Sequence, residues 1–245
     1  MSEKIVVVVP AYNEAGTIAR VIGELKIAKK AGIIHDIIVV ANGCTDNTVN
    51  EVKRTKVNLI EEKVANKGLA LFAGMKWAQK HSATTFVMVD ADVTKLKLSS
   101  LKKLIEPVVR KKTPMSVAHF NFGKSAPNLV PSNKYSGFRA ISMRALNPIL
   151  VSNRVWLRNI TTGPYGVETA LNAHIFGRKY INDKVSLPKN AVVSETFVLT
   201  RPPRSLGTVK NNVSEIASHF DRRAKLAKEL REARKKKIVI KKRLK

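Results

Sequence analysis

The sequence contains a single cysteine, Cys44, so the chain has no pair of cysteines for an internal disulfide bond. A chain without disulfides fits a reducing compartment. No apolar run approaches the roughly 18 residues that a membrane-spanning helix requires. The first apolar run, residues 5–9, is also too short for the hydrophobic region of a signal peptide. From these absences we expect a cytoplasmic protein, with any membrane contact peripheral and on the inner face.

Aromatic residues are scarce as well. The chain has 2 Trp, 4 Tyr and 8 Phe, and Phe220 alone lies within the basic C-terminal segment. Proteins that bind single-stranded nucleic acid usually stack bases on clustered aromatic rings. The composition therefore predicts no nucleic-acid partner, although a basic nucleic-acid-binding protein on a catalytically inactive scaffold stays open as an alternative.

Positive charge is abundant and unevenly placed. The formal net charge is +27. Residues 1–95 carry 13 Lys and Arg against 10 Asp and Glu, whereas residues 96–245 carry 32 against 8. We therefore expect the second part of the chain to face an anionic partner such as phospholipid, a phosphorylated substrate or nucleic acid.

Apolar strands and amphipathic helices alternate through the first half of the chain. The predicted strands are residues 5–9, 36–40, 57–60, 86–89, 116–122, 180–182 and 192–193. The predicted helices are residues 15–30, 45–54, 67–80, 99–110, 142–150 and 166–176. The stretch 123–140 is rich in Gly, Pro, Asn and Ser and predicts a loop. This order predicts an α/β fold with a mostly parallel sheet flanked by helices.

The C-terminal segment, residues 213–245, predicts a basic amphipathic helix that follows a domain of residues 1–212. Apolar residues recur there at intervals of three and four, and Lys and Arg fill much of the remainder. Such a helix suits an anionic membrane surface, where each basic residue contributes about 1 kcal/mol. The alternative is a helix packed against the domain with a solvated outer face.

The apolar run 86–89 ends in two carboxylates, Asp90 and Asp92, one residue apart. Residues two apart on an extended chain point the same way. In open α/β sheets, ligands bind at the carboxyl ends of the strands. Two hard oxygen ligands there suit Mg²⁺ or Mn²⁺. The alternative is an acidic turn that caps the next helix.

Polar segments also follow the other predicted strands of the first half. These segments are Pro10-Ala11-Tyr12-Asn13-Glu14, Ala41-Asn42-Gly43-Cys44-Thr45-Asp46 and Asn66-Lys67-Gly68. None of them is a glycine-rich phosphate loop. Because the carboxyl ends of parallel strands meet at one edge of a sheet, we expect all four segments to form one site.

Taken in order, the four segments resemble the nucleotide-sugar-binding half of family-2 glycosyltransferases, which have the GT-A fold, a Rossmann-like sheet. The resemblance is close over about residues 4–95 and loose over the remainder. It implies a nucleotide-sugar half, residues 1–95, and an acceptor half, residues 96–212. It also implies inverting transfer of a sugar from a nucleotide diphosphate-sugar, dependent on Mg²⁺ or Mn²⁺. Sugar-1-phosphate nucleotidyltransferases resemble the chain less, because their glycine-rich turn is missing.

The resemblance assigns the donor site residue by residue. The turn that holds the base and ribose is matched by Pro10, Ala11, Tyr12 and Glu14. The family usually has Asp where this chain has Ala41, so the base stays open between UDP and GDP, with Asn42 offering an amide. For Tyr12 the alternative is a half-buried packing residue.

The resemblance also assigns the metal and phosphate contacts. Asp92 matches the direct metal ligand and so a catalytic position, and Asp90 matches the carboxylate that meets the ribose or shares the metal. Lys67 begins a helix, where its charge and the free N–H groups attract phosphate, a solvated lysine being the alternative. Arg201 and Arg204 form a stiff basic loop suited to covering the leaving group.

Three other side chains receive mainly structural interpretations. We expect Cys44 to be a small packing residue and Asp46 to cap a helix or brace its turn. His219 is a candidate further metal ligand, although a lone histidine on a helix is more often structural.

Glu168 is the candidate acceptor-side catalytic residue. It lies at the start of the apolar helix 166–176 and matches the acidic residue near the acceptor in the family. A carboxylate there removes the proton of an acceptor hydroxyl, whereas an ionised phosphate acceptor needs little base. The alternative is a carboxylate that stabilises the helix N-terminus.

The resemblance and the basic C-terminal segment, residues 213–245, together indicate the class of acceptor. The chain is similar to the soluble-type dolichyl-phosphate mannose synthases, which act on a polyprenyl phosphate at the membrane surface. A polyprenyl phosphate is therefore the expected acceptor, and a soluble phosphorylated or glycan acceptor is the alternative.

Overall fold

The computed structural model describes residues 2–93, 96–120, 137–152, 166–176 and 192–197. The strands are β1 (Ile5–Ala11), β2 (Asp36–Asn42), β3 (Asn58–Glu62), β4 (Thr85–Met88), β5 (Met115–Phe120), β6 (Arg139–Ser142) and β7 (Val192–Phe197). The helices are α1 (Ile18–Lys30), α2 (Thr48–Thr55), α3 (Lys67–Lys80), α4 (Leu98–Val109), α5 (Met143–Ser152) and α7 (Gly166–Phe176). All these strands join one sheet in the order β3-β2-β1-β4-β6-β5-β7.

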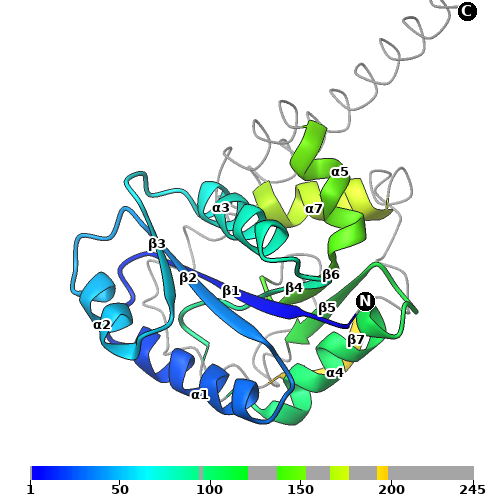
Figure 1. The fold of residues 1–245 in the computed structure, drawn as a ribbon, viewed down its shortest axis with the longest axis horizontal. Coiled ribbons are helices and arrows are strands. Elements are labelled where there is room, and N and C mark those ends of the chain that lie inside the picture. Colours follow the sequence, from blue (N-terminus) through cyan, green and yellow to red (C-terminus); the bar gives the residue numbers. More distant parts are fainter. Residues whose placement is uncertain (1, 94–95, 121–136, 153–165, 177–191, 198–245) are drawn as a thin grey trace, which may run out of the picture.

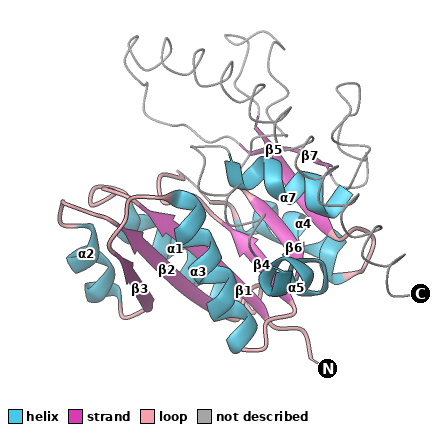
Figure 2. Ribbon diagram, turned by 90° about the horizontal axis from the view of Figure 1, so that it is seen from above, coloured by secondary structure: helices cyan, strands magenta, loops and turns pink. Residues whose placement is uncertain are grey.

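The sheet is sandwiched between two helical layers (Figure 1). Strand β1 is buried along its whole length and pairs in parallel with β2 and β4, so it lies inside the parallel part of the sheet. Its Val7 and Val9 pack in the core beneath α1, α2 and α4. Val6 and Val8 point the other way, into the core beneath α3, α5 and α7. Figure 2 shows α3, α5 and α7 over the strands.

Strand β6 corrects the prediction that residues 123–140 form a loop. Arg139–Ser142 lies between β4 and β5 and is antiparallel to both. Phe138 and Ala140 face one core, and Ile141 faces the other. A short strand that carries a charged residue, Arg139, at a fully buried position lacks the apolar pattern from which strands are predicted.

The other described boundaries lie within about three residues of the predictions, except that the strand predicted at residues 192–193 extends to Phe197. Helices 67–80 and 166–176 have the predicted bounds. Helix α1 begins three residues later than predicted, because the carbonyl of Glu14 accepts from the N–H groups of Thr17 and Ile18 in a turn. The predicted strand 180–182 and the predicted helix 213–245 lie outside the described residues.

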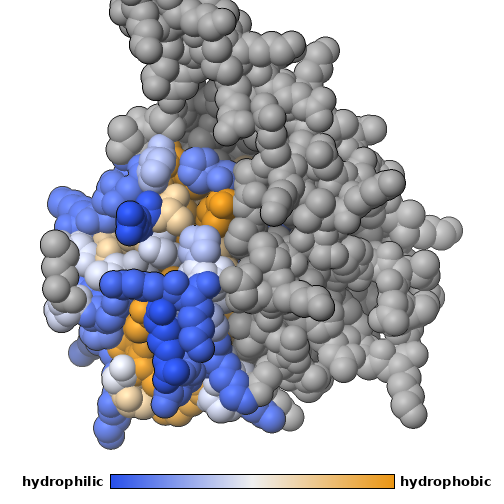
Figure 3. All heavy atoms as spheres, turned by 90° about the vertical axis from the view of Figure 1, so that its right-hand side faces the viewer, coloured by the Kyte–Doolittle hydropathy of each residue, from blue (hydrophilic) through white to orange (hydrophobic). Residues whose placement is uncertain are grey.

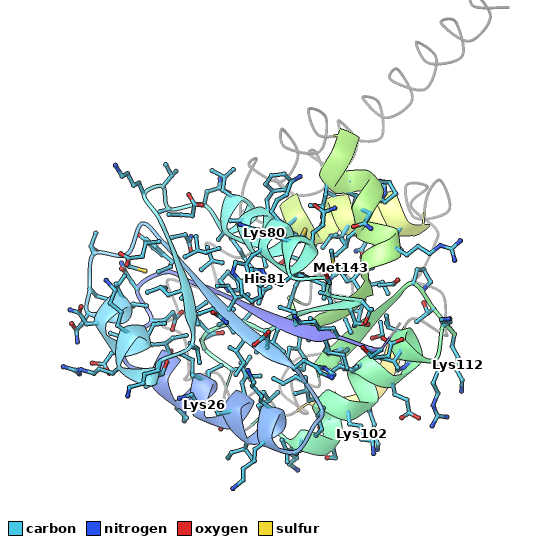
Figure 4. All side chains as sticks on the ribbon, in the orientation of Figure 1. Lys26, Lys80, His81, Lys102, Lys112 and Met143 are labelled. Atoms are coloured by element: carbon cyan, nitrogen blue, oxygen red, sulfur yellow. The ribbon has the colours of Figure 1, made fainter. Side chains whose placement is uncertain are left out.

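The face of the molecule seen in Figure 3 carries both polar and apolar residues. Hydrophilic residues cover much of the described surface in Figure 3, with apolar residues between them. Lys26, Lys102 and Lys112 lie at the periphery on the α1 and α4 side of the sheet (Figure 4). Of the helices within the described ranges, none is long and apolar enough to cross a membrane.

Candidate active site

The four polar segments gather at one edge of the sheet, as the parallel pairing of β1 to β4 requires. The first two of them are tied together by hydrogen bonds. Asn13 accepts from the backbone N–H of Thr45 at 2.8 Å, and the backbone N–H of Glu14 donates to the hydroxyl of Thr48 at 2.7 Å. Asn13 adopts a left-handed conformation with φ of 54°, which asparagine tolerates better than most residues.

Asp46 braces the second segment against the first, one of the two roles predicted for it. Its carboxylate accepts from the backbone N–H groups of Thr48 at 2.9 Å and Ala15 at 3.1 Å, and also from the Thr48 hydroxyl. The hydrogen bond from the Thr48 side chain is the main cause that lowers the pKa of Asp46 below its ordinary value. The thiol of Cys44 donates to the carbonyl of Ala11 at 3.3 Å, which fits its predicted packing role.

Asn42 is buried at the end of β2 and joins three elements. In the orientation that satisfies both ends of its amide, the amide N–H donates to the Ala11 carbonyl at 2.6 Å. The amide oxygen accepts from the backbone N–H of Asn66 at 3.2 Å. The amide is therefore used inside the protein, and the base contact predicted for Asn42 would require these bonds to open.

Gly43 allows the third segment to lie directly on the second. Its φ is +65°, and a Cβ there would lie 2.6 Å from the backbone nitrogen of Ala65. The Gly43 N–H donates to the carbonyl of Glu62 at 2.7 Å. Only glycine combines this backbone conformation with so close an approach.

The predicted base-and-ribose turn has a buried and an exposed part. Pro10 and Ala11 are buried at the end of β1, whereas Tyr12 is 51% exposed. Glu14 is partly buried, and its carboxylate accepts from the hydroxyl of Thr17 at 2.7 Å. The Tyr12 ring is thus the side chain of this turn with the most surface left for a ligand.

Lys67 contacts two carboxylates that come from distant parts of the sequence. Its ammonium nitrogen lies 2.9 Å from Oδ1 of Asp90 and 3.1 Å from Oε1 of Glu168. Lys67 is the first residue of α3, Asp90 follows β4, and Glu168 lies in the first turn of α7. Residues predicted separately as a phosphate contact, a metal or ribose contact and an acceptor-side carboxylate therefore surround one ammonium group.

Charge balance holds this cluster together. Burial by itself would lower the pKa of Lys67, but the attraction of Asp90 and then of Glu168 outweighs it and raises the pKa above the usual range. The Lys67 side chain is still 33% exposed, against 14% for Asp90 and 1% for Glu168. Lys67 is therefore protonated at neutral pH, with part of its side chain open to a ligand.

Glu168 has unused hydrogen-bonding capacity. Among the described residues, no donor makes a hydrogen bond with either of its buried carboxylate oxygens. The ammonium of Lys67 lies 3.1 Å from one of these oxygens and forms an ion pair with it. Buried carboxylate oxygens normally have donors, and both oxygens can accept a further hydrogen bond.

The two carboxylates after β4 suit a divalent cation that takes its remaining ligands from substrate phosphates and water. Asp90 and Asp92 are both partly buried, one residue apart. Within the described ranges, no group of three or more His, Cys, Asp or Glu residues forms a complete metal cage. Two carboxylates with substrate phosphates and water are a usual ligand set for Mg²⁺, and oxygen ligands also suit Mn²⁺.

Three residues that the sequence reasoning missed lie beside this cluster. A Cβ on Gly137 would lie 2.6 and 2.7 Å from the two carboxylate oxygens of Asp90. Arg139 is fully buried and donates to the side-chain oxygen of Asn172 on α7. The spacing of Asn172, four residues after Glu168, was a signal that could have identified it.

Arg201, Arg204 and His219 lie outside the described residues. Their predicted roles as covers of the leaving group and as a metal ligand stay predictions.

The architecture is that of a glycosyltransferase with the GT-A fold. A crystal structure of glucosyl-3-phosphoglycerate synthase from Mycobacterium tuberculosis, in complex with Mn²⁺ and UDP-glucose, matches with a TM-score of 0.68. The match covers 91% of this chain and 79% of that one at 20% identity. A structure of the same enzyme with Mg²⁺ and UDP matches with a TM-score of 0.63, also at 20% identity, over 85% of this chain and 74% of that one.

The family model described as glycosyl transferase family 2 matches residues 6–155, and the chain belongs to this family. This confirms the resemblance on which the sequence analysis relied. No curated protein matches the chain.

Proposed function

We propose that the protein transfers a sugar from a nucleotide diphosphate-sugar to an acceptor oxygen, with inversion at the anomeric carbon and with dependence on Mg²⁺ or Mn²⁺. The observation that carries this proposal is the contact of Lys67 with both Asp90 and Glu168. It sets a donor-side and an acceptor-side carboxylate around one cation. Family membership and the Mn²⁺ and UDP-glucose in the similar structure support the same function.

The donor half supplies the nucleotide contacts in this proposal. Residues 1–95 form the nucleotide-sugar half, and residues 96–212 form the acceptor half. The base and ribose would bind at Pro10, Ala11, Tyr12 and Glu14, and Asn42 would reach the base only if its bonds to Ala11 and Asn66 opened. The base itself stays open between uracil and guanine, because Ala41 replaces the expected carboxylate.

The diphosphate would bind beside Lys67. Asp92 and Asp90 would hold the cation, which when bound neutralises charge on the departing diphosphate. Lys67 adds a fixed positive charge at the same place, and the N-terminus of α3 adds its free N–H groups. Arg201 and Arg204 would cover the leaving group from the acceptor half.

Glu168 acts as the general base in the proposed reaction. The acceptor oxygen forms a bond to the anomeric carbon, the bond from that carbon to the diphosphate oxygen breaks, and the nucleoside diphosphate leaves with the electron pair. The hydroxyl proton passes to the Glu168 carboxylate, whose oxygens have room for it.

The acceptor expected from the sequence, a polyprenyl phosphate, is supported by the basic amphipathic pattern of residues 213–245, which suits an anionic membrane. The buried Glu168 carboxylate, which pairs with Lys67 and accepts no hydrogen bond that meets geometric criteria from the described residues, favours a second class, a hydroxyl-bearing phosphorylated small molecule. An ionised phosphate offers few protons to a buried carboxylate and repels it, whereas a hydroxyl donates to it. One similar structure contains phosphoglyceric acid, which carries both a hydroxyl and a phosphate group.

Calorimetry with UDP, GDP and their sugar conjugates, in Mn²⁺ and then in EDTA, tests the donor site. We expect metal-dependent binding of one nucleotide, and no binding to the folded protein would contradict the proposal. Transfer to phosphoglyceric acid and to a polyprenyl phosphate is then compared. Proton NMR of the product gives the anomeric configuration and so tests inversion.

A further inference from the structure

The segment that leads into β6, residues 137–139, touches the candidate site on its donor side. Gly137 packs so closely on Asp90 that a Cβ would approach the carboxylate carbon to 2.9 Å and its oxygens still more closely. Any side chain at this position would displace Asp90 or the backbone. The start of β6 therefore determines where the Asp90 carboxylate can lie.

The same segment reaches the acceptor side through Arg139. Its neighbours Phe138 and Ala140 face the α1 and α4 core, so Arg139 points toward the α7 layer. There its guanidinium donates to the side-chain oxygen of Asn172 and lies 3.7 Å from the sulfur of Met115. Both Arg139 and Asn172 are fully buried. Burying a guanidinium is costly, and the planar group fixes its partners in direction as well as distance.

Asn172 and Glu168 lie four residues apart on α7 and so share one side of the helix. Two paths thus join Asp90 to α7. One runs through the ion pairs of Lys67 to Glu168, and the other runs through Gly137 and Arg139 to Asn172. The second path is buried and contains no predicted ligand contact between its ends.

We propose that Arg139 and Asn172 are positioning residues, which hold α7 so that Glu168 stays at its working distance from Lys67 and Asp90. This inference rests on the proposed function, because the distance matters only if the two carboxylates serve one reaction. A side chain misplaced by about 1 Å can lower a rate about a hundredfold. Lys67 alone is a weak tether, because its flexible stem lets the ammonium follow a moving carboxylate.

The test compares Asn172→Leu with Leu171→Ala in the full-length protein. Leu171 is the neighbouring buried residue on α7, and its truncation loosens the helix without removing the Arg139 bond. For each variant we would measure the unfolding temperature, the affinity for UDP and Mn²⁺, and kcat for transfer to phosphoglyceric acid. A crystal structure of Asn172→Leu would give the distance between Lys67 and Glu168.

We expect Asn172→Leu to lower kcat by about tenfold or more, with nucleotide affinity changed less than about twofold. The distance from Lys67 to Glu168 should lengthen past the range of an ion pair. Leu171→Ala should retain kcat within about threefold although it unfolds at a lower temperature. Equal losses of kcat in both variants, or an unchanged distance in Asn172→Leu, would overturn the inference.

The experiment separates an error in the proposed function from an error in this inference. If the wild-type protein transfers sugar from none of the tested donors, the transferase proposal is wrong. The distance from Lys67 to Glu168 in the Asn172→Leu structure still decides whether Arg139 and Asn172 hold α7 in place.

Discussion

Lys67 and Glu168 form an ion pair of 3.1 Å that joins the start of α3 to the first turn of α7. The carboxylate is buried and the ammonium is partly exposed, so a ligand can reach the cation while the anion stays in low dielectric. A donor phosphate that draws Lys67 toward itself would leave Glu168 with less compensating charge.

Replacing Glu168 by Gln should lower kcat by about 10²- to 10⁴-fold, because the amide cannot take the hydroxyl proton. Nucleotide affinity should change little, since Glu168 does not belong to the donor half. Steady-state kinetics and calorimetry of the same preparation measure the two effects. An equal loss of both would make Glu168 a structural residue.

Replacing Asp92 by Asn should abolish metal-dependent nucleotide binding and turnover, because the amide removes one negative charge from the cation site. Calorimetric titration of the nucleotide with and without Mn²⁺ tests this. The exposed Glu61→Gln variant is a control that removes a carboxylate on β3, where Glu61 pairs with the exposed Lys53. Unchanged turnover in Asp92→Asn would exclude its metal role.

Replacing Lys67 by Met should lower the free energy of unfolding at neutral pH by about 1–3 kcal/mol, because two carboxylates lose their shared cation. The pKa of Lys67 is raised in the folded protein, so its contribution is complete below the ordinary value of 10.5. It is lost only as the pH rises through the higher, folded-state pKa. Urea unfolding from neutral to alkaline pH, with the exposed Lys63→Met as control, measures this difference; a difference that disappears near neutral pH would contradict it.

The contribution of the Asp46 carboxylate to the stability of the folded protein should be lost in acid. Its pKa is lowered in the folded protein, so its contribution is complete above the ordinary value of 3.8 and is lost as the pH falls through the lower, folded-state pKa. The wild-type protein should therefore unfold at a higher temperature than Asp46→Asn at neutral pH, and the two should converge in acid. Equal unfolding temperatures at neutral pH would mean that the brace contributes nothing to stability.

Deleting residues 222–245 should weaken attachment to anionic vesicles and leave nucleotide affinity unchanged, because the deleted residues are rich in Lys and Arg. Co-sedimentation with phosphatidylglycerol vesicles measures the attachment, and phosphatidylcholine vesicles are the control. Equal co-sedimentation of the two proteins would exclude the tail as a membrane contact, and with it the main support for a polyprenyl phosphate acceptor.

Most of the donor half could be predicted from the sequence because local signals there agree with one another. Apolar runs such as residues 5–9 end in polar turns, and each turn falls at the same edge of a parallel sheet. Lys67 and Glu168 were each identified from the family resemblance, and each lies at a helix start. Their contact could not be predicted, since it depends on how α3 and α7 pack across the sheet.

The acceptor half was harder to predict because its signals are long-range. Strand β6 has four residues and contains Arg139, whose burial makes sense only once Asn172 is opposite. Gly137 appears in the sequence as one more residue of a Gly-rich loop, and its role becomes clear only from the position of Asp90. In the donor half, Asn42 was expected to face the base, but its amide is bound to the ends of β1 and α3.

The bonds that tie the first three polar segments together also constrain how this donor site can change. Asn13 meets Thr45, Asn42 spans Ala11 and Asn66, and the backbone of Gly43 lies against Ala65. A graft of one segment from a relative with another nucleotide preference would break bonds to the other two. If the three segments bind the nucleotide as proposed, a change of donor specificity requires exchanging them as a set.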